Sequence, residues 1–334
     1  MSPMPDEEIK VDVLMPTFNH ENFIDQAIQS VLMQKCSFKY RLIISDDRST
    51  DNTLKICEKY ATLHSNEILL LKNPTNLGMA ANYKSLFNAS SASYIAILEG
   101  DDYWIDIHKL QKQIEVLESN PDIGLVHTNY YSLYTNGKIK KGHIGEKITS
   151  LSGHLIGPSQ TVEININPLT TCFRGFLAKE NMDFDFIISN NLLTIDIFLW
   201  AEVCRRTSVL YLDEVTGVYR IHSSSLTGNY NLDSIERFNM TSLISANYFM
   251  EKYNATQHIR DVVNSKTKIN LIFSYLLANQ HHKAKNELQN VNKAMNLKDK
   301  IICLAAEYRP MNFLAHLLAL YYRIGSAVKQ RVFR

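Results

Sequence analysis

Short apolar runs alternate with amphipathic stretches along the first part of the chain. The apolar runs cover residues 11–15, 41–45, 68–71 and 94–98, and stretches with helical periodicity follow them at 23–33, 53–60, 80–88 and 107–119. This alternation predicts repeated βα units and a mainly parallel sheet. Another apolar segment, at 123–131, predicts a fifth strand. The expected fold class is therefore α/β.

The pattern changes in the second part of the chain. Residues 135–167 are polar, contain glycine and lack periodicity, which predicts loops or short strands. Helical periodicity returns at 193–205, a β-like run covers 209–219, and nearly everything beyond residue 231 is compatible with helix. We therefore expect an α/β domain over residues 1–230 and an all-α appendage over residues 231–334.

Composition and charge narrow the classes of function. The chain has 334 residues, of which 45% are hydrophobic, so it can bury a large core. Its 35 Lys and Arg against 34 Asp and Glu leave a formal charge of +1, which argues against a nucleic-acid partner. An anionic ligand must be held by local groups. The five cysteines form no CxxC pair and residues 1–10 show no signal-peptide pattern, from which we expect reduced thiols and a cytoplasmic location.

Polar residues follow each of the first four predicted strands. In chain order they are Pro16-Thr17-Phe18-Asn19, the run from Asp46 to Asp51, Asn76-Leu77-Gly78, and Glu99-Gly100-Asp101-Asp102. The carboxyl ends of parallel strands share one edge of the sheet, so these segments should face a common crevice. Asp47 is expected to accept a hydrogen bond from a nucleobase, and the segment from Ser49 to Asp51 to cap a helix. Asn76 and Gly78 could bind a ligand or could equally form a plain turn. Asn82 could likewise be an exposed helix residue.

The fourth segment offers carboxylates where a phosphate site would usually offer a glycine-rich loop. Carboxylates repel phosphate but can hold a divalent cation that binds it, and Asp101 and Asp102 provide the oxygen ligands that Mn²⁺ or Mg²⁺ prefers. Glu99 is close enough to help through ribose hydroxyls or water. An isolated acidic run is more often a solvated turn, but its place after an apolar strand favours a site.

Four motifs in this order, PTFN, ISDDRSTDNT, NLGMAANY and ILEGDD, resemble the pattern of glycosyltransferase family 2 on a GT-A fold. The resemblance covers about the first two thirds of the chain. It implies an inverting glycosyltransferase with Asp101 as the main metal ligand and Asp102 beside it, whereas Glu99 departs from the family's first acidic position. The nucleotide-sugar site that it implies contains Pro16, Thr17, Phe18, Asn19, Asp47, Asn76, Gly78, Asn82, Glu99, Gly100, Asp101 and Arg220.

The resemblance also points to a catalytic base. Asp196 is the one ionisable residue between Asn190 and Ala201, at the start of an apolar helix. From the residues alone it is either a partner of the helix dipole or a base tuned by burial. The segment Thr194 to Trp200 resembles the family's ED-LW motif, with Ile195 in place of Glu, which implies that Asp196 is the base.

A last motif, Tyr219-Arg220-Ile221-His222, resembles the family's YRxH segment. It implies that His222 approaches the metal or the diphosphate. Arg220 either neutralises charge on the leaving group or forms a structural ion pair. The other histidines, His20 among them, show no ligand spacing and are expected on the surface or in the core.

The expected partners are a nucleotide-diphosphate sugar donor and a glycan or lipid-linked acceptor, with acceptor contacts in residues 135–167 and the appendage. The apolar and basic stretch 311–334 suits either peripheral contact with the inner face of the cell membrane or packing on the domain or in a homodimer, and packing is favoured. Two rival functions are a catalytically silent binding or assembly subunit and a sugar-phosphate nucleotidyltransferase. The second rival lacks support because Pro16-Thr17-Phe18-Asn19 is not the glycine-rich, arginine-containing loop that such enzymes carry.

Overall fold

The computed structural model describes residues 8–142, 166–222, 232–289, 291 and 297–308. These residues fall into two compact units, one within 8–222 and the other within 232–308. The expected domain boundary near residue 231 and the stretch 311–334 lie outside the described residues. The domain limits therefore stay a prediction.

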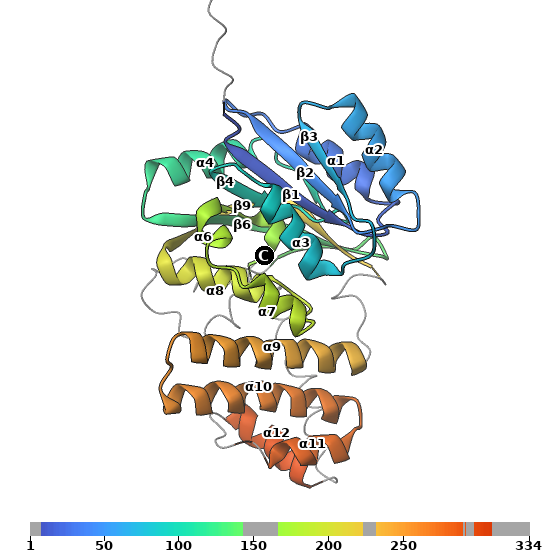
Figure 1. Ribbon diagram of the computed structural model, residues 1–334. Helices are drawn as coiled ribbons and strands as arrows, with labels where there is room; N and C mark the ends of the chain where they lie inside the picture. Colours follow the sequence, from blue (N-terminus) through green and yellow to red (C-terminus); the bar gives the residue numbers. More distant parts are fainter. Residues whose placement is uncertain (1–7, 143–165, 223–231, 290, 292–296, 309–334) are drawn as a thin grey trace, which may run out of the picture. The chain divides into compact units, whose positions relative to one another are not determined.

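Nine strands of the described residues form one sheet in the first unit (Figure 1). Its order is β3-β2-β1-β4-β8-β6-β9-β5, with β7 paired to β6. The strands are β1 (Val11–Thr17), β2 (Tyr40–Asp46), β3 (Ile68–Lys72), β4 (Tyr94–Ile97), β5 (Tyr103–Trp104), β6 (Ile123–Tyr134), β7 (Ile139–Lys141), β8 (Cys172–Arg174) and β9 (Ser208–Ile221).

The first four strands form the parallel half of the sheet, as the alternating pattern predicts. The other half is mixed, because β8 is antiparallel to both β4 and β6, whereas β6 and β9 run parallel. The short strand β5 is antiparallel to β9. It follows the acidic run directly, so this pairing ties the run to the far edge of the sheet.

Helices cover both faces of the sheet. On one face lie α1 (Ile24–Leu32), α2 (Thr53–Leu63) and α4 (Lys109–Ser119), which share a hydrophobic cluster with the strands. On the other lie α3 (Met79–Ala89), which contacts β1 and β2, and α8 (Asp196–Arg206), which contacts β6; the short helices α6 (Gly175–Lys179) and α7 (Phe184–Ser189) pack beside them.

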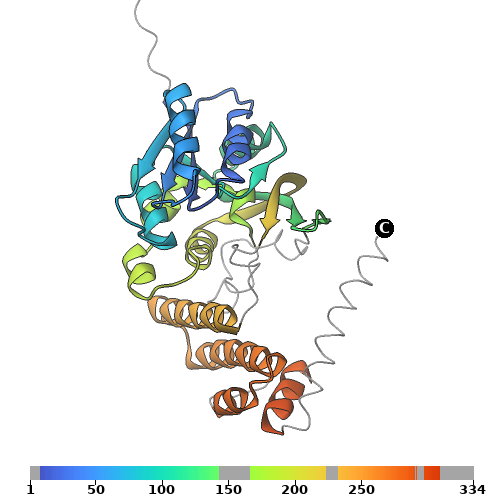
Figure 2. The same ribbon diagram turned by 90° about the vertical axis from the view of Figure 1, so that its right-hand side faces the viewer.

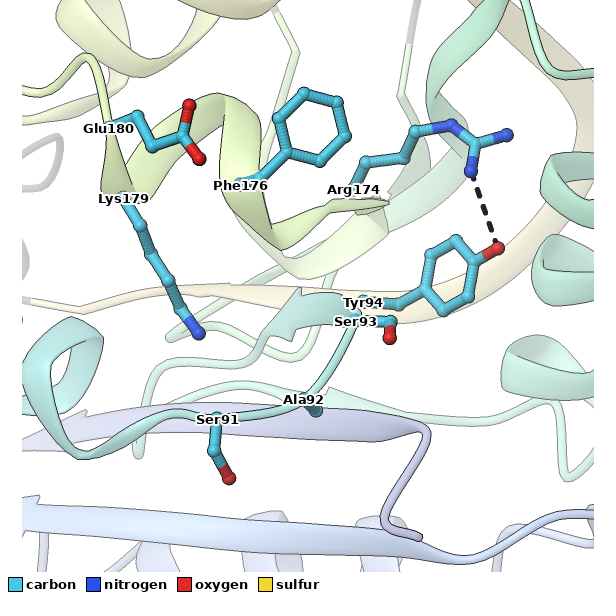
Figure 3. Close-up of a pocket in the computed structure, with 8 residues that line it drawn as sticks. All are labelled: Ser91, Ala92, Ser93, Tyr94, Arg174, Phe176, Lys179 and Glu180. Atoms are coloured by element: carbon cyan, nitrogen blue, oxygen red, sulfur yellow. Dashed lines mark hydrogen bonds between the residues drawn. The ribbon is translucent and has the colours of Figure 1, made fainter.

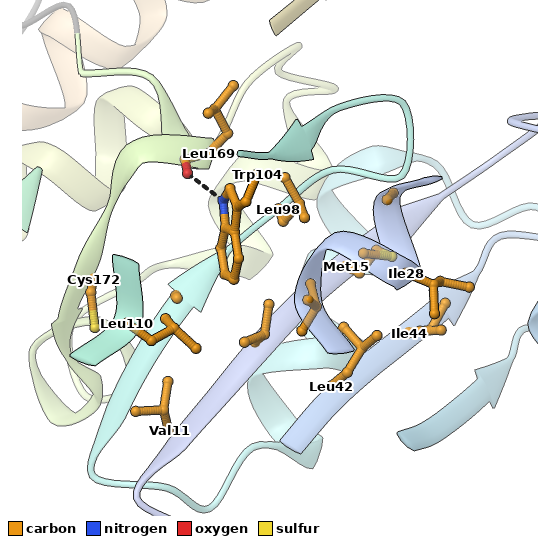
Figure 4. Close-up of a cluster of buried hydrophobic side chains, with 14 of the residues drawn as sticks. Val11, Met15, Ile28, Leu42, Ile44, Leu98, Trp104, Leu110, Leu169 and Cys172 are labelled. Atoms are coloured by element: carbon orange, nitrogen blue, oxygen red, sulfur yellow. Dashed lines mark hydrogen bonds between the residues drawn. The ribbon is translucent and has the colours of Figure 1, made fainter. Parts of the chain in front are cut away.

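The core follows from the two-residue period of the strands. Val11, Val13 and Met15 of β1 point into the cluster around α1 (Figure 4), and Asp12 and Leu14 alternate with them. Trp104 closes the same cluster, and its indole nitrogen donates a hydrogen bond to the carbonyl oxygen of Leu169 at 2.8 Å. The end of β5 is thereby fixed by the core.

The second unit is helical, as expected. It consists of α9 (Leu232–Lys252), α10 (Gln257–Leu277), α11 (His281–Leu288) and α12 (Leu297–Glu307). Helix α10 runs alongside α9 (Figures 1 and 2) and packs on α11 and α12 around a core that includes Ile272, Leu276 and Ile302. Within the described part of the chain, no helix combines the length and the apolar character that crossing a membrane requires.

Candidate active site

The carboxyl ends of β1, β2 and β4 lie side by side, because the three strands are parallel and in register. Backbone hydrogen bonds extend this order into the loops. Gly100 donates to the carbonyl of Pro16 at 3.1 Å, and Asp47 donates to the carbonyl of Thr17 at 2.9 Å. The first, second and fourth polar segments therefore meet at one edge of the sheet.

Hydrogen bonds join the first segment, which ends at Asn19, to the second, which runs from Asp46 to Asp51. The backbone nitrogen of Asn19 donates to Oγ of Ser49, and Oδ1 of Asn19 accepts from the backbone of Thr50 at 2.8 Å. Asn19 holds a φ of 57° in the left-handed region, which asparagine tolerates better than most residues. Beside it, the ring of Phe18 is 42% exposed and free to contact a ligand.

The predicted helix cap at Ser49 to Asp51 holds for Asp51 alone, whose Oδ1 accepts from the backbone nitrogen of Thr53, the first residue of α2. Helix α2 begins after Asn52, which makes no side-chain cap bond. Ser49 and Thr50 instead bind Asn19, and Asp51 accepts from the backbones of Thr53 and Glu21. Ser49, Thr50 and Asp51 hold the two loops together, because Asn19 and Glu21 lie in the loop after β1.

Asp47 organises the third segment. Its two carboxylate oxygens accept from the backbone nitrogens of Leu77 at 2.8 Å and Gly78 at 2.9 Å, and Asn73 also donates to it. Asn76 donates to the Asp47 carbonyl. Asp47 is thus buried and bonded within the chain. Its Oδ1 already accepts two hydrogen bonds, so a nucleobase would have to use the second lone pair of Oδ2.

Asn82 is buried rather than exposed, so the exposed alternative is wrong. Its amide donates to the carbonyl of Ser45 at 3.1 Å and accepts from Asn73. It therefore ties α3 to β2 behind the Asp47 loop. Direct contact with a nucleotide stays a prediction.

The acidic run forms a tight cluster of carboxylates. One ligand atom from each of Glu99, Asp101 and Asp102 lies within 4.8 Å of the other two. Asp102 is fully buried, and its Oδ1 accepts from the backbone nitrogen of Arg220 at 2.8 Å. Its Oδ2 has no hydrogen-bond partner among the described residues. A buried carboxylate oxygen of this kind requires a cation or a proton.

The carboxyl groups of the cluster differ in acidity. Burial, with the charges of Asp101 and Asp196, raises the pKa of Glu99 to about 8. Burial, with Asp101 and Glu99, raises the pKa of Asp102 well above its usual range. Although burial opposes it, the hydrogen bond with His222 and the charges of both nearby histidines lower the pKa of Asp101. Asp101 is therefore the carboxylate of the run that stays ionised.

Arg220 braces the run. Its guanidinium donates to the carbonyl of Asp101 and to Gln26, and it lies over the rings of Tyr103 at 4.4 Å and Phe23 at 5.1 Å. Arg220 is 9% exposed. These contacts give it a structural role, and a contact with the leaving group stays a prediction.

Two histidines flank Asp101. Nε2 of His222 lies 3.0 Å from Oδ2 of Asp101, and Nε2 of His20 lies 3.9 Å from the same atom. His222 thus lies beside the acidic run, and its contact with a metal or a diphosphate stays a prediction. His20 is a residue that the sequence analysis missed. The signal that was available is its place directly after Pro16-Thr17-Phe18-Asn19.

Asp196 enters the site from the other face of the sheet. It is the first residue of α8, and burial raises its pKa to about 7. Its charge contributes to the raised pKa of Glu99, so the two carboxyl groups are near enough to interact electrostatically. Tyr83 of α3, also missed from the sequence, donates to Glu99 at 2.9 Å.

A cavity of about 470 Å³ lies at the amino end of β4, where Figure 3 shows Arg174 and Lys179 among its lining residues. Both cations bind the chain itself: Arg174 donates to the carbonyls of Ile123 and Leu117, and Lys179 to that of Ser90. Both cations of the cavity are therefore already engaged with backbone carbonyl oxygens.

A family model described as Glycosyl transferase family 2 matches residues 12–182. The chain belongs to glycosyltransferase family 2. The motifs that resemble this family lie at the strand ends described above. The loops between β1, β2 and α3 lie within the residues that the family model matches.

Known proteins extend the comparison. WfgD from Escherichia coli, a UDP-Glc:alpha-D-GlcNAc-diphosphoundecaprenol beta-1,3-glucosyltransferase, is 28% identical over 229 residues, which cover 67% of this chain and 81% of WfgD. The Mycobacterium bovis protein Mb1547 is 32% identical over 127 residues, 38% of this chain and 37% of Mb1547. The match thus spans well under half of that relative's length.

A solved structure confirms the fold. The mannosyltransferase PcManGT from Pyrobaculum calidifontis, in complex with GDP-Man and Mn²⁺, superposes with a TM-score of 0.56 at 15% identity over 98% of this chain and 88% of that chain. The predicted GT-A class, with helices after the sheet domain, is confirmed.

Proposed function

We propose that the chain is an inverting glycosyltransferase that moves a sugar from a nucleotide-diphosphate sugar to a hydroxyl group of a glycan or lipid-linked acceptor. The observation that carries this proposal is the nearness of Asp196, at the start of α8, to the acidic run after β4. One group suited to accept a proton thus lies beside groups suited to hold a cation. An inverting transfer needs these two functions and no covalent nucleophile.

The acidic run fits a divalent cation. Its ligand atoms are carboxylate oxygens within 4.8 Å of one another, and Oδ2 of Asp102 is buried without a hydrogen-bond partner among the described residues. Asp101, which stays ionised, and Asp102 would hold Mn²⁺ or Mg²⁺, with His222 beside them. A cation bound there supplies positive charge to the diphosphate as its bond to the sugar breaks.

The chain's own residues supply the rest of the chemistry. Asp196 takes the proton of the acceptor hydroxyl while the oxygen of that hydroxyl forms a bond to the anomeric carbon. At the same time the bond from the anomeric carbon to the diphosphate oxygen breaks. Attack opposite the leaving group inverts the anomeric centre. Phe18, Asn19 and the Asp47 loop would hold the nucleoside at the far side of the same edge.

The relatives support the substrate classes. The name of WfgD gives a UDP-sugar donor and a lipid-diphosphate acceptor, and PcManGT was solved with GDP-Man and Mn²⁺. For this chain we propose a nucleotide sugar as donor without choosing the base. A cytoplasmic location, membrane contact through residues 311–334 and a homodimer stay predictions.

A binding panel tests the proposal. Thermal shift is measured with UDP, GDP and their sugars, each with and without Mn²⁺, for the wild type and for Asp101→Asn. We expect a shift with one nucleotide family that depends on Mn²⁺ and is lost in Asp101→Asn. No shift with any nucleotide would overturn the proposal.

Hydrolysis of the nucleotide sugar distinguishes a transferase from a catalytically silent binding subunit. A wild-type protein that binds the nucleotide sugar but never releases the nucleoside diphosphate, with water or any offered acceptor, would favour a silent binding subunit. Mn²⁺-dependent release of the nucleoside diphosphate would favour the transferase.

A further inference from the structure

His20 lies beside the acidic run and makes three contacts there. Its Nδ1 lies 3.1 Å from Oγ1 of Thr17, and its backbone nitrogen donates to Oγ1 of Thr53 at 2.7 Å. Its Nε2 faces Oδ2 of Asp101 at 3.9 Å. The imidazole therefore bridges the end of β1 and the carboxylate that follows β4.

Gly100 leaves the space that this imidazole occupies. A Cβ atom built on Gly100 would lie 2.7 Å from Oγ1 of Thr17 and 2.9 Å from Nδ1 of His20. Both distances are shorter than real Cβ contacts allow. A glycine at this position thus permits His20 to lie against the backbone of the acidic run.

Both imidazoles near Asp101 approach the same oxygen. His222 lies 3.0 Å and His20 3.9 Å from Oδ2, and the three side chains are only 12%, 19% and 15% exposed for His222, His20 and Asp101. Two contacts to Oδ2 restrict the rotation of the carboxylate and with it the direction of Oδ1.

We infer that His20 is a positioning residue for Asp101, which it holds together with His222 so that Oδ1 meets the divalent cation. This inference rests on the proposed function, since it assigns a task to a residue of the same site. Groups that orient a metal-binding carboxylate affect the affinity for the metal although they do not bind it themselves.

Two substitutions of different side-chain length distinguish a role in positioning Asp101 from a role in supporting the loop through Thr17. In His20→Gln the terminal amide reaches the position of Nε2, from which it still faces Asp101 as the imidazole does at 3.9 Å. In His20→Asn the amide reaches the position of Nδ1, so only the contact with Thr17 is kept. A residue that merely supports the loop would be replaced better by Asn, whereas a positioning residue would be replaced better by Gln.

The test is Mn²⁺ binding, measured by calorimetry or electron paramagnetic resonance in the presence of UDP, and separately of GDP, with the full chain. We expect His20→Ala to raise the Kd for Mn²⁺ by roughly 10–100-fold. His20→Gln should restore much of the affinity and His20→Asn should not. His108→Ala, at an exposed position before α4, is the matched control and should bind like the wild type.

The outcomes separate the two proposals. If the wild type binds Mn²⁺ with a nucleotide and His20→Ala binds it equally well, the role of His20 is wrong and the proposed function stands. If His20→Asn binds as the wild type does and His20→Gln does not, the role is also wrong. A wild type that binds no Mn²⁺ with either nucleotide overturns the proposed function and this role with it.

Discussion

The phenol of Tyr83 donates a hydrogen bond to Oε1 of Glu99, with 2.9 Å between the two oxygens. Tyr83 is on α3 and 1% exposed, whereas Glu99 is the first residue of the acidic run after β4. The bond therefore joins the NLGMAANY motif to the ILEGDD motif. It uses one oxygen of Glu99, the carboxyl group whose pKa the charges of Asp101 and Asp196 help to raise.

Replacing Tyr83 by Phe removes this donor and little else, because the ring stays buried. We expect the free energy of unfolding to fall by about 1 kcal/mol, the usual net value of one hydrogen bond. Glu99 loses the contact that orients it, so KM for the nucleotide sugar should rise more than the stability loss explains. Chemical denaturation and steady-state kinetics of the same sample check both, and an unchanged KM would show that Glu99 does not depend on Tyr83.

Gly78 has a backbone that other residues rarely adopt, with φ of 82° and ψ of 161°. Since an added Cβ would meet no atom within 4 Å, the cost of Gly78→Ala comes from backbone strain, about 1–3 kcal/mol. The strain would move the nitrogen that donates to Asp47, and nucleotide affinity should fall. Gly137→Ala is the control, because Gly137 also has a positive φ of 76° and open space but lies in the turn before β7. Equal nucleotide affinity in the two variants would contradict the role of the Asp47 loop.

The acidity of Asp196 predicts how transfer depends on pH. A general base acts in its ionised form, and burial raises the pKa of Asp196 to about 7. The ionised fraction therefore increases as pH rises through about 7, and turnover should increase with it and level off above that range. Turnover is measured from pH 5.5 to 8.5 at saturating donor and metal. A rate that is constant or falls over this range would contradict a base with this pKa.

Lys109 predicts a pH dependence of stability. It is fully buried on α4, where its Nζ binds Oε1 of Gln113 at 2.7 Å and lies 4.3 Å from the ring centre of Trp104. Burial lowers the pKa of Lys109 to about 7, whereas an unfolded chain titrates lysine near pH 10 to 11. Between these values the unfolded state holds more protons, so this lysine makes the folded state more stable as pH rises.

Lys109→Met isolates this contribution. The free energy of unfolding of the wild type, minus that of the variant, should increase between pH 7 and 9.5 by an amount on the order of 1 kcal/mol per pH unit. Urea denaturation at three pH values measures it. A difference that stays constant would mean that Lys109 keeps its charge in the folded protein.

Local periodicity predicts the part of the fold in which neighbouring elements follow each other along the chain. The strands β1 to β4 and the helices between them are long enough for their apolar spacing to repeat. By contrast, β5 and β8 have two and three residues and show no period. They exist because β9 and β4 are there to pair with, and those partners are distant in sequence.

The candidate site also contains residues that the sequence predicts and residues that it does not. The rule that ligands gather at strand ends finds Asp101, Asp102 and the loops around Asn19 and Asp47. It does not find His20 or Tyr83, because their partners are Asp101 and Glu99 in another segment. It also does not reveal that the capping residues near Ser49 bind Asn19, since that contact forms only when two loops meet.

Asp196→Asn tests the central claim most directly, because the substitution keeps the shape of the side chain and removes its ability to take a proton. Binding of the nucleotide sugar with Mn²⁺ and sugar transfer are measured on the same protein, with Asp185→Asn, an exposed residue of α7, as the control. We predict that Asp196→Asn binds the donor with nearly the affinity of the wild type and that its turnover falls by roughly 10²–10⁴-fold. Turnover equal to that of the wild type would contradict Asp196 as the base and the mechanism built on it.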